Sequence, residues 1–119
     1  MAGGLFLQSE QNLSDGYTVT GSVTSATNLF SVDTQGYKRI AVNVSSAGTT
    51  CTVTYEASAD NVNWVSVAGY APSAPATETV ASTTTAVATV FRTDLRYFRA
   101  RVSTYTSGTV TAAANLRLS

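Results

Sequence analysis

Apolar and polar side chains alternate with a period of two through most of this chain. In the stretch 37–45, Ile40, Val42 and Val44 fall on one phase, and the residues between them are small, polar or charged. The stretch 95–104 repeats the pattern. Because successive side chains of a strand point to opposite faces of a sheet, this period predicts half-buried β-strands. No window shows the apolar period of an amphipathic helix, so we predict an all-β fold.

Turn-forming residues divide the chain into short segments. Gly, Asn and Asp mark these turns because they tolerate the left-handed backbone conformation. Two prolines, Pro72 and Pro75, place 69–76 in a loop, since proline cannot donate a hydrogen bond to a β-ladder. Turns are predicted at 15–16, 35–36, 46–48, 60–61, 82–85 and 106–108. The predicted strands are 17–20, 28–33, 37–45, 50–56, 62–67, 77–81, 86–93, 95–104 and 109–118.

About eight or nine strands at a spacing of roughly ten residues are typical of a β-sandwich or a small barrel. We predict an antiparallel β-sandwich with Greek-key or jelly-roll connections. The 119 residues are enough for one domain with its own core. We assign residues 14–119 to this domain and residues 1–13 to a flexible N-terminal arm.

The arm carries a short apolar cluster, Leu5, Phe6 and Leu7, after two glycines. Burying one Phe or Leu side chain contributes about 1.5–3 kcal/mol, so three of them could anchor the arm on a neighbouring subunit. A frayed terminus or a first edge strand is the alternative interpretation of the same residues.

The charges of the chain are balanced, with seven Lys and Arg against seven Asp and Glu. Nucleic-acid binding draws most of its affinity from cations that neutralise phosphates, so we expect no nucleic-acid partner. No apolar run approaches the ~20 residues that span a bilayer, and we expect no membrane partner. The first residues lack the basic segment of a secretory signal, which predicts assembly in a host cytoplasm.

The sequence offers few groups for catalysis. It contains no histidine, which removes Ser-His triads, Cys-His dyads and the usual zinc sites. Cys51 falls on the inward phase of its strand and is interpreted as a small buried hydrophobe. Glu56 and Asp60 could form a glycosidase pair, and Asp60, Asn61 and Asn63 could bind calcium. Because Glu56 lies on an outward phase and Asp60 is a turn former, we expect no enzyme activity, no cofactor and no metal.

Two groups of residues are candidates for binding a partner. Tyr97, Arg99 and Arg101 share the outward face of the strand 95–104, and planar Arg side chains suit interface ion pairs. This face could contact an acidic subunit surface, a nucleic acid, or only solvent. Trp64 and Tyr55 could form a platform on which sugars stack, but a single Trp in a sandwich also fits the core or an interface. We predict that Trp64 lies in the core.

Two segments resemble hairpins of small β-sandwich proteins in the virions of tailed bacteriophages. The segment 55–67, YEASADNVNWVSV, is similar to their S-x-D-x-x-x-W-x-x-V hairpin. The segment 95–111, LRYFRARVSTYTSGTVT, looks like their closing hairpin, an aromatic and Arg-rich strand followed by Ser-Gly-Thr-Val. Similar hairpins occur in capsid decoration (cement) proteins and in tail and fibre modules, so the resemblance indicates a virion structural protein.

This resemblance implies a sandwich that binds the major capsid protein, often as a homo-oligomer and often through a terminal arm. We therefore predict a decoration protein on the capsid surface of the virion that bridges and stabilises major capsid protein subunits. Leu5, Phe6, Leu7, Tyr97, Arg99 and Arg101 are the predicted contact residues. The alternative is a phage tail or fibre module that binds a glycan or another receptor.

Overall fold

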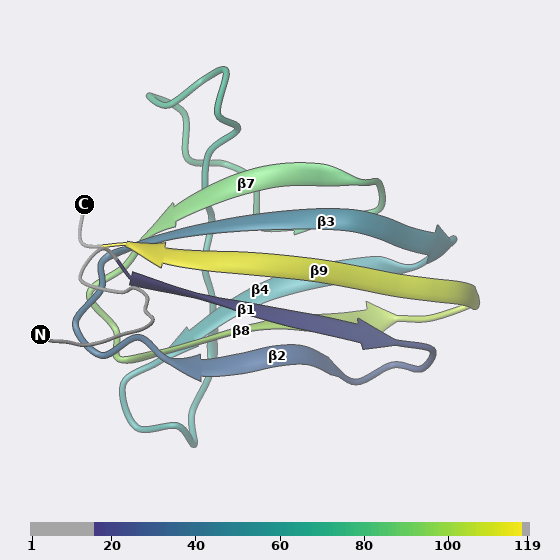
Figure 1. Ribbon diagram of the computed structural model, residues 1–119, viewed down its shortest axis with the longest axis horizontal. Helices are drawn as coiled ribbons and strands as arrows, with labels where there is room; N and C mark the ends of the chain where they lie inside the picture. Colours follow the sequence, from purple (N-terminus) through teal and green to yellow (C-terminus); the bar gives the residue numbers. More distant parts are fainter. Residues whose placement is uncertain (1–15, 118–119) are drawn as a thin grey trace, which may run out of the picture.

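The computed structural model describes residues 16–117, which fold into nine β-strands with no helix among them (Figure 1). The residue alternation described above produces these strands, and their burial patterns alternate in the same way. The strands are β1 (Gly16–Val23), β2 (Asn28–Asp33), β3 (Arg39–Thr49), β4 (Thr52–Ser58), β5 (Val65–Ser66), β6 (Ser82–Thr83), β7 (Val87–Arg92), β8 (Tyr97–Thr104) and β9 (Ser107–Arg117).

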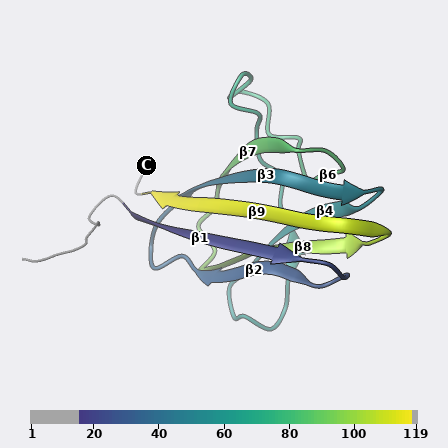
Figure 2. The same ribbon diagram turned by 45° about the vertical axis from the view of Figure 1, so that its right-hand side comes forward.

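Two antiparallel sheets pack face to face, which confirms the predicted β-sandwich. Sheet A has the order β1-β9-β3-β7, and sheet B has the order β2-β8-β4-β5, with β6 also paired to β4. Sheet A lies in front of sheet B in Figure 1 and in the turned view of Figure 2. The pairs β1–β9, β2–β8, β3–β7 and β4–β5 are nested, as if one long hairpin had been wrapped around the core. This arrangement is a jelly roll.

The core lies between the sheets and consists of the inward phase of each long strand. Phe98, Ala100 and Val102 of β8 are buried as predicted. They meet a cluster of aromatic rings in which the Tyr55 and Phe91 centroids are 4.6 Å apart. Cys51 is also buried, as predicted. The remaining buried apolar residues come from both sheets and, for Tyr70, from the segment between β5 and β6: Leu29, Phe30, Ile40, Val42, Val44, Ala47, Val53, Ala57, Tyr70, Val110, Ala112, Ala114 and Leu116.

The turn predicted at 46–48 is wrong, because β3 continues through it to Thr49. Two register shifts against β9, between Val44 and Ser46 and between Ala47 and Thr49, absorb the extra residues as β-bulges. Gly48 has a φ of 63°, and Thr50 has a φ of 54° where the chain reverses into β4. A glycine within a bulged strand therefore gives the same sequence signal as a turn at the end of a strand.

The strand predicted at 62–67 is mostly loop. Val65 and Ser66 form the ladder with β4, and the Val67 N–H extends it by donating to the Tyr55 carbonyl oxygen at 3.1 Å. Val62 is 74% exposed, and Trp64 is half-buried outside the core cluster, so the predicted core position of Trp64 is wrong. The strand predicted at 77–81 is reduced to one bridge between Gly69 and Val80. Part of the turn predicted at 82–85 instead forms β6. Sheet B therefore has a short, interrupted edge beside β4.

The predicted arm, with Leu5, Phe6 and Leu7, lies outside the described residues. Within the described range 16–117, no helix is both long and apolar enough to cross a membrane. The same residues contain no cluster of three or more acidic or cysteine side chains arranged to hold a metal ion.

Candidate functional site

The outward face of sheet B carries the predicted contact residues of β8. Tyr97, Arg99 and Arg101 alternate with the buried residues of the strand, so all three lie on the outer face as predicted. Each is half-buried, because side chains of β2 and β4 flank them. The sandwich therefore brings these residues together on one surface.

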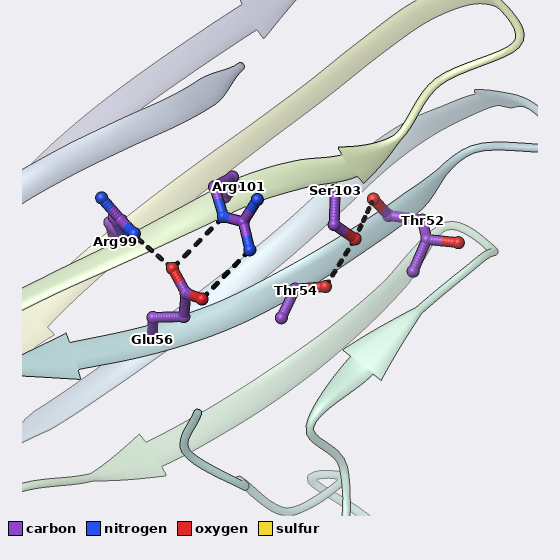
Figure 3. Close-up of polar contacts among 6 residues, drawn as sticks. All are labelled: Thr52, Thr54, Glu56, Arg99, Arg101 and Ser103. Carbon is purple, nitrogen blue, oxygen red and sulfur yellow. Dashed lines mark hydrogen bonds and ion pairs between the residues drawn. The ribbon is translucent and has the colours of Figure 1, made fainter. Parts of the chain in front are cut away.

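Glu56 of β4 holds the two arginines in place (Figure 3). Its Cα is the register partner of Arg99. Arg99 Nε donates to Oε1 at 2.7 Å, and Arg101 donates from Nε to Oε1 at 3.3 Å and from an Nη atom to Oε2 at 3.1 Å. The exposed fractions of the side chains are 14% for Glu56, 20% for Arg99 and 38% for Arg101. We call these three residues the Glu56 clamp.

The clamp lowers the pKa of Glu56 from its ordinary value of 4.5. Partial burial of the carboxyl group acts in the opposite direction and raises this pKa. The hydrogen bonds from Arg101 and Arg99, together with their positive charges, outweigh burial. Glu56 is therefore ionised at neutral pH and is unsuited to act as a general acid there.

Polar pairing continues along the same face beyond the clamp. The hydroxyl oxygens of Thr54 and Ser103 are 2.7 Å apart, and Ser103 Oγ donates to the carbonyl oxygen of Thr52 at 3.4 Å (Figure 3). Together with the clamp, these contacts join β4 to β8 along the outer surface of sheet B. The side chains of this strip are thus held to one another, and we infer that the face is stiff.

Trp64 lies against this face. The Arg99 guanidinium carbon sits 4.1 Å from the centroid of the Trp64 ring, in a cation–π contact. Arg99 therefore binds Glu56 through Nε and covers one side of the indole. The sequence signal that could have placed Trp64 here is the run of polar residues before it, which indicates a loop rather than a strand.

Asp60 organises the loop that leads to Trp64. Its Oδ1 accepts from the backbone N–H groups of Val62 and Asn63 and from Ser58 Oγ, and its Oδ2 accepts from Asn63 Nδ2. The backbone N–H of Asn63 is the largest of the causes that hold the pKa of Asp60 well below its usual range. Asn61 adopts a φ of 62° within the loop. Because four donors already point at the carboxylate, the calcium arrangement weighed for this loop does not fit.

A second ion pair flanks Tyr97. Arg96 donates from Nε and from an Nη atom to Asp33 Oδ2, at 3.1 and 2.9 Å. The Arg96 guanidinium also lies over the Tyr97 ring, 5.2 Å from its centroid. The hydrogen bond from Arg96 is the largest of the causes that lower the pKa of Asp33. Tyr97 is thus positioned by an exposed pair, whereas Arg99 and Arg101 are positioned by a half-buried one.

The carboxylate pair weighed for glycosidase chemistry does not converge on a cleft. Glu56 is directed at two arginines, and Asp60 is directed into its own loop. The site offers a preorganised set of cations, hydroxyl groups and one aromatic ring. Such a set suits recognition of another surface.

No protein-family model matches this sequence, and a search of curated proteins found no match. Among solved structures, the chain is similar to the SPBc2 prophage-derived protein YomS, with a TM-score of 0.63. The two chains share a fold. The match covers 88% of this chain and 99% of YomS at 14% sequence identity. The likeness therefore extends over nearly the whole sandwich, and at this identity it shows the architecture alone.

Proposed function

We propose that this chain is a non-enzymatic structural protein of a bacteriophage particle, a decoration or cement protein that bridges and stabilises major capsid protein subunits. The observation that carries the proposal is the jelly-roll sandwich shared almost end to end with a prophage-derived protein. The proposal places the chain on the capsid surface, as one of many copies.

The two segments that resemble phage virion hairpins support the proposal because they lie together in space. The first contributes most of β4, and the second contributes β8 and the start of β9. β4 and β8 are neighbours in sheet B, with Glu56 opposite Arg99. The resemblance therefore concerns one continuous part of the sandwich rather than two scattered motifs.

The proposed mechanism is mechanical. A sandwich whose outer face is held by the Glu56 clamp loses little conformational entropy when it docks, because its contact side chains are already ordered. Arg101, 38% exposed, is the clamp residue most available to a carboxylate of the coat. Weak contacts add up through multivalency when many copies bind one shell, and apolar residues of the arm add to them.

The test uses particles that lack this protein. Purified full-length chain is mixed with them, the particles are sedimented, and the bound copies are counted. We expect saturable binding to the capsid and a higher capsid melting temperature. A variant lacking residues 1–8 should lose binding while its own melting temperature stays unchanged. Undiminished binding of this variant would contradict the role of the arm, and sedimentation with tails alone would contradict the capsid assignment.

A second candidate function is favoured by the position of Trp64. Because its ring is half-buried on the surface of sheet B instead of lying in the core, a tail or fibre module that binds glycans is the alternative. Arg99 covers one side of the ring, so only the other side could stack on a sugar. Titration of Trp64 fluorescence with oligosaccharides tests this, and a saturable change would favour the alternative over the decoration role.

A further inference from the structure

The outer face of sheet A differs in chemistry from that of sheet B. Its centre, on β3 and β9, consists of short uncharged side chains, among them Ala41, Asn43, Ala113 and Asn115. No aspartate or glutamate occurs in β1, β3, β7 or β9. The four strands therefore give this face little relief and no negative charge of their own.

Three arginines form a row across one end of this face. The Cα of Arg39 on β3 is in register with Arg92 on β7 and with Arg117 on β9. Each follows or precedes a buried residue of its strand, and all three are exposed. Neighbouring strands lie about 4.8 Å apart, so the row spans roughly 10 Å. We call these residues the arginine row.

Arg92 of the row is already engaged by the long segment between β5 and β6. It lies 3.4 Å from a Glu78 carboxylate oxygen, donates to the Pro75 carbonyl oxygen at 3.2 Å, and stacks on the Tyr70 ring at 4.4 Å. Its charge is neutralised within the domain. The other two members of the row are Arg39 and Arg117.

No ion pair within residues 16–117 includes Arg39 or Arg117. The five ion pairs there use Asp94, Glu78, Asp33 and Glu56, the last of them twice. The fifth carboxylate, Asp60, is occupied by its own loop, as described above. Like charges directly opposite one another on a sheet are destabilising. Arg39 and Arg117 therefore form a like-charged pair that a carboxylate bridging both guanidinium groups would stabilise.

We propose that the outer face of sheet A is a docking surface for an acidic protein surface, with Arg39 and Arg117 together binding its carboxylates. Planar guanidinium groups bind carboxylates in a bidentate manner, and the short side chains beside them let another backbone approach closely. Two cations without an ion pair among residues 16–117 are too few for nucleic acid, whose affinity grows with the number of phosphates neutralised. The inference rests on the proposed function only for the identity of the partner, a coat subunit.

The experiment measures binding of the full-length chain to poly-L-glutamate by isothermal titration calorimetry at low salt. The variant Arg39→Gln with Arg117→Gln should lose affinity about tenfold or more, since two charge-assisted hydrogen bonds are removed. The matched control is Lys38→Gln, which removes a neighbouring cation that is paired with Asp94 at 3.5 Å. We expect this control to stay within about twofold of the wild type, because one exposed ion pair contributes little.

Three outcomes would overturn the proposal. Because the double variant removes two charges and Lys38→Gln removes one, an equal loss of binding free energy per charge removed would show that only net charge matters. Binding of a thymidine oligonucleotide as tight as that of poly-L-glutamate would show a nucleic-acid surface. Stronger binding by Glu10→Gln with Asp15→Asn would show that the chain's own carboxylates occupy the site.

The particle assay separates this inference from the proposed function. If the wild type binds particles and the double arginine variant binds them equally well, the docking surface is wrong and the decoration role stands. If the wild type binds poly-L-glutamate through Arg39 and Arg117 but never binds particles, the surface stands and the decoration role is wrong.

Discussion

Replacing Glu56 by Gln should destabilise the domain more than any change at an exposed ion pair. Gln keeps the volume and one acceptor oxygen of Glu56 but removes the negative charge. Arg99 and Arg101 would then face each other across a neutral side chain, with only 20% and 38% of their side chains exposed to solvent. The loss of stability comes from two half-buried cations that are left without a counter-charge.

The magnitude follows from the burial of the clamp. Breaking a fully buried ion pair costs about 3–5 kcal/mol, and breaking an exposed one costs about 0–1 kcal/mol. Glu56 and Arg99 lie nearer the buried limit, whereas solvent screens Arg101, so we expect a loss of about 1–3 kcal/mol. For a domain of this size, a loss of about 2 kcal/mol lowers Tm by roughly 6–12 °C.

The measurement is urea unfolding of the wild type and of Glu56→Gln at pH 7 and at acid pH. Because the folded state lowers the pKa of Glu56, the clamp stabilises the fold above the ordinary pKa of 4.5. That stability is lost as pH falls through the folded-state pKa. The difference between the two proteins should therefore be largest at pH 7 and shrink once Glu56 is protonated in both states.

The control is Asp94→Asn, which removes the partner of Lys38 in a pair whose side chains are 70% and 88% exposed. This variant should stay within about 0.5 kcal/mol of the wild type. If Glu56→Gln is no less stable than this control, the clamp contributes nothing to stability. A difference from the wild type that persists unchanged at acid pH would equally refute the electrostatic explanation.

Three further predictions concern the core and the bulged strand. The buried hydroxyl groups of Tyr55 and Thr89 make no hydrogen bond of good geometry, although Thr89 lies close enough to lower the pKa of Tyr55. Tyr55→Phe with Thr89→Val should therefore be neutral or stabilising in urea unfolding, and a loss of more than about 1 kcal/mol would show that the two hydroxyl groups bond to each other. Burial raises the pKa of Tyr55 to about 12. Ionisation of Tyr55 should therefore lower the free energy of unfolding of the wild type by roughly 2–3 kcal/mol between pH 10 and 12, and this contribution should be absent from Tyr55→Phe. Gly48→Ala should destabilise more than Gly36→Ala, because a Cβ at 48 would lie 2.7 Å from a backbone oxygen whereas the one at 36 meets nothing within 4 Å; equal melting temperatures would contradict this.

The alternation of apolar and polar residues predicted those features of the fold that depend on residues close together in the sequence. It identified the inward and outward faces of β8 and the sandwich class, because the period of two reports which side of a strand is buried. It failed at Trp64, where four hydrogen bonds to Asp60 impose a loop on residues that otherwise alternate like a strand. A local polar network overrode a weak periodic signal there.

Contacts between distant strands lay beyond what the pattern could predict. The outward position of Glu56 was expected, but its partners Arg99 and Arg101 are 43 and 45 residues away and meet it only through the register of β4 and β8. The same holds for Arg39 and Arg117, which become neighbours only because β3 pairs with β9. Register depends on the whole topology, so it is visible in the structure and not in any one segment.

The pair Arg99 and Arg101 differs from the pair Arg39 and Arg117 in the contacts that a partner's carboxylate would have to displace. To bind such a group fully, Arg99 would have to release Glu56, at a cost comparable to the clamp's own contribution of about 1–3 kcal/mol. Arg101 can keep Glu56 and still present its exposed edge, so it suits an added contact at the rim of an interface. Arg39 and Arg117 have no ion pair to break within residues 16–117, and a bound carboxylate would relieve their mutual repulsion. On these grounds sheet A should supply charge recognition, while the clamp on sheet B supplies the stiffness that keeps the sandwich in one shape as it docks.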